Sequence, residues 1–164
     1  KDQKMKNLEI LGLEPAKVGN VVKGLNQLLA DFQIYYMNLR GLHWNVKGKG
    51  FFTLHEKYEE LYNDAANKVD EIAERILQLD ATPENRFSEY LKVASIKEDG
   101  FQQKGSEGID VVLGTLKNLI QQERNLIKTA EEANDEVTVA IMDEYLQQQE
   151  KTVWMLVSFL SEHK

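Results

Sequence analysis

The chain of 164 residues has no cysteine, only two prolines and only three histidines. Without cysteine there can be no disulfide bond, zinc-thiolate site or thiol catalysis. The scarcity of proline, beside plentiful Leu, Glu, Lys, Gln and Ala, favours long helices. No apolar run approaches the roughly 18 residues of a membrane span, and the N-terminal residues lack the apolar segment of a secretory signal. We therefore expect an all-α protein of the cytoplasm with no membrane association.

A net positive charge is also missing. The formal net charge is −7, which argues against a uniformly basic surface for nucleic acid. With 42% hydrophobic and 29% charged residues, the composition is ordinary for a globular protein. The length suits one domain with a sizeable core. We expect residues 1–164 to form a single domain, with residues 1–14 as a flexible N-terminal tail.

Apolar residues recur at helical spacing in four long segments. These segments span approximately residues 18–44, 54–79, 109–133 and 135–161. A long connection between the second and third segments carries a short apolar-patterned piece near residues 88–93, and such a length is typical of a crossover. Short first and third connections with a long central one predict a ferritin-like four-helix bundle, with a short extra helix in the central connection.

Three local patterns predict where helices begin. Pro15 suits the start of the first long helix, because proline is favoured in the first turn. Thr53 followed by Glu56 has the spacing of a capping box for the second helix. Asn134 is the expected cap of the fourth helix, which would then begin at about Asp135.

Two histidines and two carboxylates have a spacing that points to a metal site. His43 ends the first long segment and His55 opens the second, while Asp70 and Glu74 lie further along the second. Imidazole and carboxylate groups are typical ligands of iron, zinc and other first-row divalent metals. His55 and Asp70 are fifteen positions apart, about 22 Å along one helix. One chain cannot bring these groups together, but two antiparallel copies can, so the spacing predicts a site at a dimer interface.

The helical wheel of the second segment supports the same conclusion. At about 100° per residue, His55, Glu59, Asp70 and Glu74 lie on a flank beside the predicted core face. That face consists of Leu54, Tyr58, Leu61, Ala65, Val69, Ile72 and Ile76. Many di-iron bundle proteins bind metal inside the bundle through Glu-x-x-His motifs, and the chain has none. We therefore expect the ligands to face a neighbouring subunit.

Several segments together resemble the Dps miniferritins, the DNA-binding proteins from starved cells. The resemblance covers nearly the whole chain, and it is carried by the motifs at residues 42–48, 51–56, 69–76 and 153–155. It implies a dodecameric hollow shell of four-helix subunits. It also implies ferroxidase centres at the two-fold interfaces, each holding two irons shared between two subunits.

The family pattern assigns roles to individual residues of this chain. It places His43 and His55 of one subunit against Asp70 and Glu74 of its partner, as catalytic ligands. Glu59 stands where the family commonly has aspartate. Because the glutamate arm is longer, direct and water-bridged ligation of iron by Glu59 both stay open.

The resemblance further implies oxidation of Fe²⁺ by hydrogen peroxide, or by O₂, and storage of ferric mineral that protects the cell and its DNA. An iron channel at the three-fold axes is expected from Glu131, Asp135 and Asp143, although this acidic run also fits a solvated helix end. Trp44, beside His43, could supply or quench oxidising equivalents, but a packing role is the alternative.

Two other function classes stay open. The first is a DNA-compacting protein associated with the nucleoid, with secondary iron chemistry. Few uncompensated lysines near the N-terminus argue for weak DNA binding, since counterion release needs many phosphate contacts. The second is a bundle enzyme with another metal or a small substrate, which would be expected as a monomer or dimer.

Overall fold

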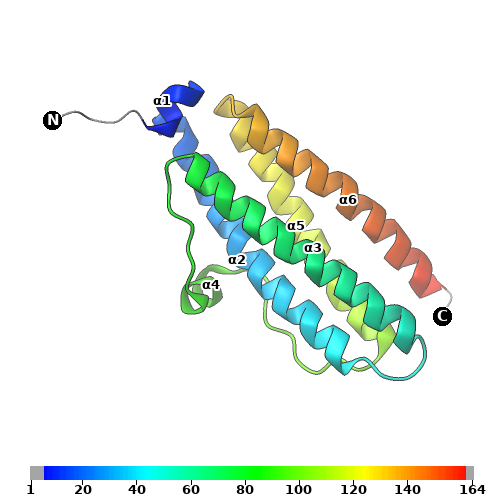
Figure 1. Cartoon of the computed structure of the whole chain (residues 1–164). Coiled ribbons are helices and arrows are strands. Elements are labelled where there is room, and N and C mark those ends of the chain that lie inside the picture. Colours follow the sequence, from blue (N-terminus) through cyan, green and yellow to red (C-terminus); the bar gives the residue numbers. More distant parts are fainter. Residues whose placement is uncertain (1–5, 162–164) are drawn as a thin grey trace.

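The computed structural model describes residues 6–161, and within them the regular structure is entirely helical. The helices of this part are α1 (Asn7–Leu11), α2 (Pro15–Asn45), α3 (Phe51–Gln78), α4 (Phe87–Val93), α5 (Gly105–Glu132) and α6 (Glu136–Ser161). The four long helices form a bundle, and α4 lies beside it in the connection from α3 to α5 (Figure 1). The predicted fold and its extra helix are confirmed. None of the described helices combines the length and apolar character that a membrane crossing needs.

The bundle core is built from the apolar faces that the periodicity predicts. On α3, every predicted core residue is buried except Val69, which is partly buried. The wheel did not predict that Lys68 and Arg75 are also buried. Lys68 Nζ donates to Asp64 at 2.5 Å and to Gln148 at 2.7 Å. Because charged side chains stay buried only when they are paired, their burial depends on partners that a helical wheel does not contain.

The start of α3 differs from the capping-box prediction. The helix begins at Phe51, and Gly48 and Gly50 turn the chain before it with φ values of 82° and 81°. No side chain caps this end, and Thr53 and Glu56 lie inside the helix. The capping-box prediction is therefore wrong, because glycines that accept positive φ set the start of the helix.

The two other predicted starts have different outcomes. Pro15 is the first residue of α2, as predicted. At α6 the cap is Asp135 instead of Asn134, since the backbone N–H of Thr138 donates to the Asp135 carboxylate at 3.0 Å and the Thr138 hydroxyl donates at 2.6 Å. Asn134 takes a positive φ of 56° and completes the turn.

Part of the predicted N-terminal tail is helical, since α1 spans Asn7–Leu11. The backbone N–H groups of Asn7 and Leu8, at the start of α1, donate to the Asp80 carboxylate at 3.2 and 3.0 Å. Leu8 is buried against the core. Residues 7–11 thus form a helix that packs on the bundle, because Asp80 accepts its first two N–H groups and the Leu8 side chain is buried. The first five residues of the predicted tail lie outside the described residues.

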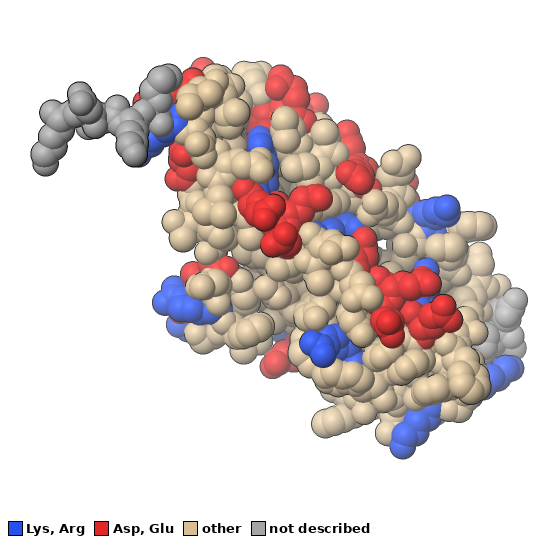
Figure 2. Space-filling view, in the orientation of Figure 1, with Lys and Arg blue, Asp and Glu red and all other residues tan. Residues whose placement is uncertain are grey.

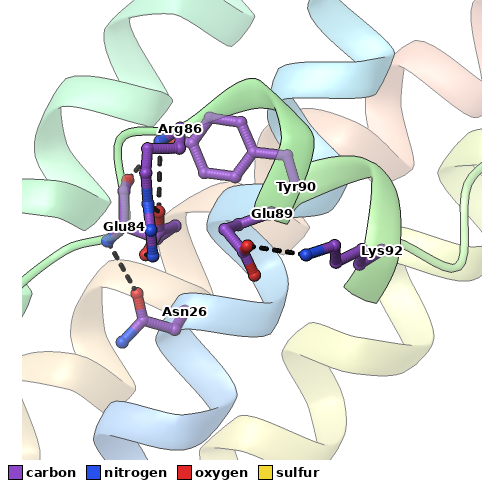
Figure 3. Close-up of polar contacts among 6 residues, drawn as sticks. All are labelled: Asn26, Glu84, Arg86, Glu89, Tyr90 and Lys92. Atoms are coloured by element: carbon purple, nitrogen blue, oxygen red, sulfur yellow. Dashed lines mark hydrogen bonds and ion pairs between the residues drawn. The ribbon is translucent and has the colours of Figure 1, made fainter.

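The crossover that carries α4 is fixed to α2. The backbone N–H of Glu84 donates to the Asn26 side chain at 3.3 Å, and the Tyr90 hydroxyl donates to the Glu84 carbonyl (Figure 3). Arg86 pairs with the Glu84 carboxylate at 2.6 Å, and this hydrogen bond lowers the Glu84 pKa. The crossover therefore packs along α2, and its last part meets the turn between α2 and α3, where the backbone N–H of Lys47 donates to the Gln103 carbonyl at 2.9 Å.

Candidate metal centre

His43 and His55 face each other across the turn between α2 and α3. Their ring centroids are 3.7 Å apart and the rings are nearly parallel, with an interplanar angle of 14°. Nδ1 of His43 lies 2.6 Å from the backbone oxygen of His55, and Nδ1 of His55 lies 2.8 Å from the backbone oxygen of His43. The two side chains, called the histidine pair below, are thus joined by reciprocal hydrogen bonds.

These bonds determine which ring nitrogens are free to bind a metal. A carbonyl oxygen only accepts hydrogen bonds, so Nδ1 must carry the proton in both His43 and His55. In a neutral imidazole, Nε2 then keeps its lone pair. The arrangement is the usual one for a metal-binding histidine, whose other nitrogen donates to a backbone carbonyl.

Aromatic side chains hold both rings in place. The Phe51 ring stacks on His55, with a centroid distance of 5.0 Å and an angle of 17°. The Tyr62 ring meets His43 edge-on at 5.3 Å. His43 is 7% exposed and His55 is partly buried. The histidine pair is therefore oriented before any ligand binds.

Glu59 is the one predicted carboxylate that lies beside the histidine pair. Its Oε1 atom is 3.8 Å from Nε2 of His43, and its side chain is 52% exposed. It follows His55 by one helical turn of α3, so both belong to one side of that helix. An imidazole nitrogen and a carboxylate oxygen at this separation suit a divalent cation bound between them.

Asp70 and Glu74 lie elsewhere. Both are exposed on α3, which continues without a break from His55 through both positions. Fifteen residues of helix put Asp70 about 22 Å from His55. Figure 2 shows groups of acidic side chains over this face of the molecule, with basic ones more scattered. Among the described residues, no three His, Asp or Glu side chains converge as a metal site.

An aromatic cage around Arg40, called the arginine cage below, lies beside the histidine pair and is not among the predicted features. The Arg40 guanidinium lies over the rings of Trp44 at 5.0 Å, Tyr36 at 5.6 Å and Tyr62 at 5.8 Å. Tyr36, Arg40 and Trp44 are spaced by four along α2, so their spacing could have indicated the cage. The Trp44 side chain packs against the guanidinium, yet the residue is 55% exposed.

The three candidate channel residues have different surroundings. Glu131 and Asp143 are exposed at the surface. Asp135 is only 1% exposed, and its carboxylate pairs with Arg75 of α3 at 2.6 Å while it caps α6. In the single chain, Asp135 therefore joins α3 to α6, and the role of all three in an iron channel stays a prediction.

Comparison with known proteins gives a consistent result. Residues 22–164 match the ferritin-like domain family. The chain is 52% identical to a DNA protection during starvation protein from Porphyromonas gingivalis, over 94% of this chain and 97% of that protein. The crystal structure of a DPS protein from Vibrio cholerae O1, described as one of the ferritin-like diiron-carboxylate proteins, superposes with a TM-score of 0.91. The two are 43% identical, and the match covers 98% of this chain and 99% of that one. A Dps protein from Bacillus brevis is 36% identical, with a TM-score of 0.86 over 88% of this chain and 97% of the other.

Proposed function

This chain belongs to the ferritin-like family and, within it, to the Dps proteins, and we propose that it stores iron by oxidising Fe²⁺ with hydrogen peroxide or O₂. The proposed centre takes His43, His55 and Glu59 from one subunit. It takes Asp70 and Glu74 from another. Its product, a ferric mineral, is kept inside a dodecameric shell and so protects the cell and its DNA from oxidative damage.

The state of the histidine pair is the observation that carries this proposal. Both Nδ1 atoms are committed to carbonyl oxygens, so both Nε2 atoms keep a lone pair for a metal. Glu59 adds one carboxylate beside His43, yet within residues 6–161 no three His, Asp or Glu side chains converge into a complete metal site. A second α3, antiparallel to the first, would bring Asp70 and Glu74 to this incomplete set, because the helix runs unbroken from His55 through both positions.

The ligand types suit the reaction. Carboxylates and imidazoles bind Fe²⁺ without thiolates, and a small number of mixed ligands lets Fe³⁺ leave for the mineral. Two Fe²⁺ held close together reduce one H₂O₂ with two protons to two waters, giving two Fe³⁺. Since both electrons reach the same peroxide, no hydroxyl radical is released.

Access of Fe²⁺ to the interior is proposed through acidic channels at the three-fold axes. Glu131 and Asp143 would offer carboxylates to the passing ion. Asp135 lies between them in the sequence and would shape the channel through its bonds to Arg75 and Thr138. A negative channel concentrates cations by electrostatic attraction.

The experiment that tests the shared centre is complementation between two inactive variants. One variant carries His43→Ala with His55→Ala, and the other carries Asp70→Asn with Glu74→Gln. Each should oxidise Fe²⁺ at the background rate. In randomly mixed shells, half of the two-fold dimers contain both variants. One of the two centres in each mixed dimer has a complete set of ligands. About a quarter of the wild-type rate should therefore return.

Ferric absorbance after addition of Fe²⁺ and peroxide measures the rate, and size-exclusion chromatography checks that each variant still assembles. Mixed shells with no recovered activity would show that the ligands come from a single chain. A wild-type protein that elutes as a monomer or dimer would favour the bundle enzyme instead.

A further inference from the structure

Glu123 is a buried carboxyl group that the proposed iron chemistry does not use. It lies on α5 inside the bundle and has no exposed surface. Nε2 of Gln149, on α6, donates a hydrogen bond to its Oε2 atom at 2.9 Å. Within the described part of the chain, Oε1 of Glu123 and Oε1 of Gln149 are both buried without a hydrogen-bond partner.

Both of these oxygens lack a hydrogen-bond donor. An amide oxygen and an ionised carboxylate oxygen only accept hydrogen bonds, so neither can satisfy the other. Buried polar atoms are normally paired, and each exception calls for an explanation. A proton on Oε1 of Glu123 supplies the missing donor, since the resulting O–H can donate to Oε1 of Gln149. Both unpartnered oxygens then take part in one hydrogen bond.

Among residues 6–161, no cation forms an ion pair with Glu123. Lys68 of α3 faces the same region, but its ammonium already donates to Asp64 and to Gln148. Arg124, one residue further on α5, pairs at the surface with Glu150 at 2.6 Å. Among the described residues, no ion pair or hydrogen bond joins either cation to Glu123.

Two buried tyrosines also interact with Glu123. Tyr35 of α2 and Tyr145 of α6 interact electrostatically with Glu123 and with Asp64 of α3. Burial is the main cause that raises the pKa of both tyrosines, so they stay neutral and offer Glu123 no charge. Burial likewise raises the pKa of Glu123 to about 8, against weaker lowering by Gln149, Lys68 and Arg124.

We infer that Glu123 is a neutral carboxylic acid in the folded protein and forms a cyclic acid–amide pair with Gln149. In this pair the Gln149 N–H donates to the Glu123 carbonyl oxygen, and the Glu123 O–H donates to the Gln149 carbonyl oxygen. The pair links α5 to α6 inside the core. The contact between these helices therefore depends on a proton, and this holds whether or not the protein oxidises iron.

The pH dependence follows from the raised pKa. In the unfolded chain Glu123 titrates near its ordinary pKa of 4.5, whereas in the folded protein its pKa is about 8. Between these values the folded state holds a proton that the unfolded chain has lost, so stability falls as the pH rises. The contribution is complete below the unfolded pKa and is gone once the pH passes the folded pKa.

Glu123→Gln is the decisive variant, because its amide N–H can replace the acid O–H at every pH. Chemical-denaturation midpoints of the assembled protein should fall for the wild type between about pH 5 and pH 8. The variant should lose that component of the fall and be the more stable protein at the upper end. Glu107→Gln removes the same charge from an exposed position of α5, and it should keep the wild-type dependence.

A second measurement does not depend on any variant. In wild-type protein labelled with ¹³C-glutamate, infrared spectra near neutral pH should contain the stretching band of a protonated carboxyl group, and this band should vanish as the pH passes the folded pKa. The exposed glutamates are ionised under these conditions. Absence of the band near neutral pH would overturn the inference, and so would a Glu123→Gln protein with the pH dependence of the wild type.

Discussion

At the level of single residues, the histidine pair determines what the proposed centre can do. Each ring orients the other through a backbone carbonyl, so a change at either position disturbs both. Histidine and carboxylate types and their spacing indicate the candidate ligands, and their role in binding metal stays a prediction. The reciprocal bonds could not be predicted, because they depend on where the turn between α2 and α3 places two carbonyl oxygens.

Glu59 offers a test of how closely its carboxylate acts with the histidine pair. Glu59→Gln keeps the size of the side chain but removes its charge beside Nε2 of His43. We expect the initial rate of Fe²⁺ oxidation to fall by about tenfold or more, as is typical when a group supporting a metal site is lost. Stopped-flow ferric absorbance measures the rate.

Glu60→Gln is the matched control, since Glu60 is the neighbouring exposed carboxylate and pairs only with Lys57 in the described structure. Its rate should equal that of the wild type. Equal rates for both variants would remove Glu59 from the proposed ligand set.

At the level of helices, the apolar periodicity predicted the four long helices to within a few residues. It failed where a polar or backbone partner decided the outcome. Arg75 is buried because its guanidinium donates hydrogen bonds to Thr138 of α6 and to Asp135, the residue that caps this helix. The short α1 forms because Asp80 accepts its first N–H groups. Such partners lie far away in the sequence, so a local pattern cannot contain them.

Close packing between α5 and α3 gives a prediction about stability. A Cβ atom added at Gly108 would collide with the hydroxyl of Tyr58, which is buried and fixed in the core. We therefore expect Gly108→Ala to lower the free energy of unfolding by about 1–3 kcal/mol, the usual effect of overpacking. Urea denaturation followed by circular dichroism measures the change.

Gly114, on the same helix, has no atom within 4 Å of an added Cβ. Gly114→Ala should stabilise the helix by about 0.5–1 kcal/mol, because alanine loses less backbone entropy on folding. A Gly108→Ala protein as stable as Gly114→Ala would mean that the packing between α3 and α5 yields more easily than the structure indicates.

At the level of the whole molecule, surface charge bears on the open question of DNA binding. The formal net charge is −7, and acidic groups are prominent on the face seen in Figure 2. We expect little or no DNA binding at about 150 mM salt, because acidic shells repel phosphates and few uncompensated lysines near the N-terminus are available for counterion release. An electrophoretic mobility-shift titration at several salt concentrations is the measurement.

A shifted band that persists at that salt concentration would favour the DNA-compacting alternative. The same titration with shells that carry the Asp70→Asn and Glu74→Gln substitutions separates the two functions. DNA binding that survives the loss of iron oxidation would show that they use different surfaces.

The uninterrupted α3 also determines the distance between the two centres of the proposed dimer. Because one helix carries the histidine at one end of the span and the carboxylates at the other, antiparallel pairing creates two equivalent centres about 22 Å apart. Inserting one residue between His55 and Asp70 would rotate the carboxylates by about 100° and ruin both centres at once. The number of residues between His55 and Asp70 is thus constrained by the fit to the partner's α3 as well as by packing within the bundle.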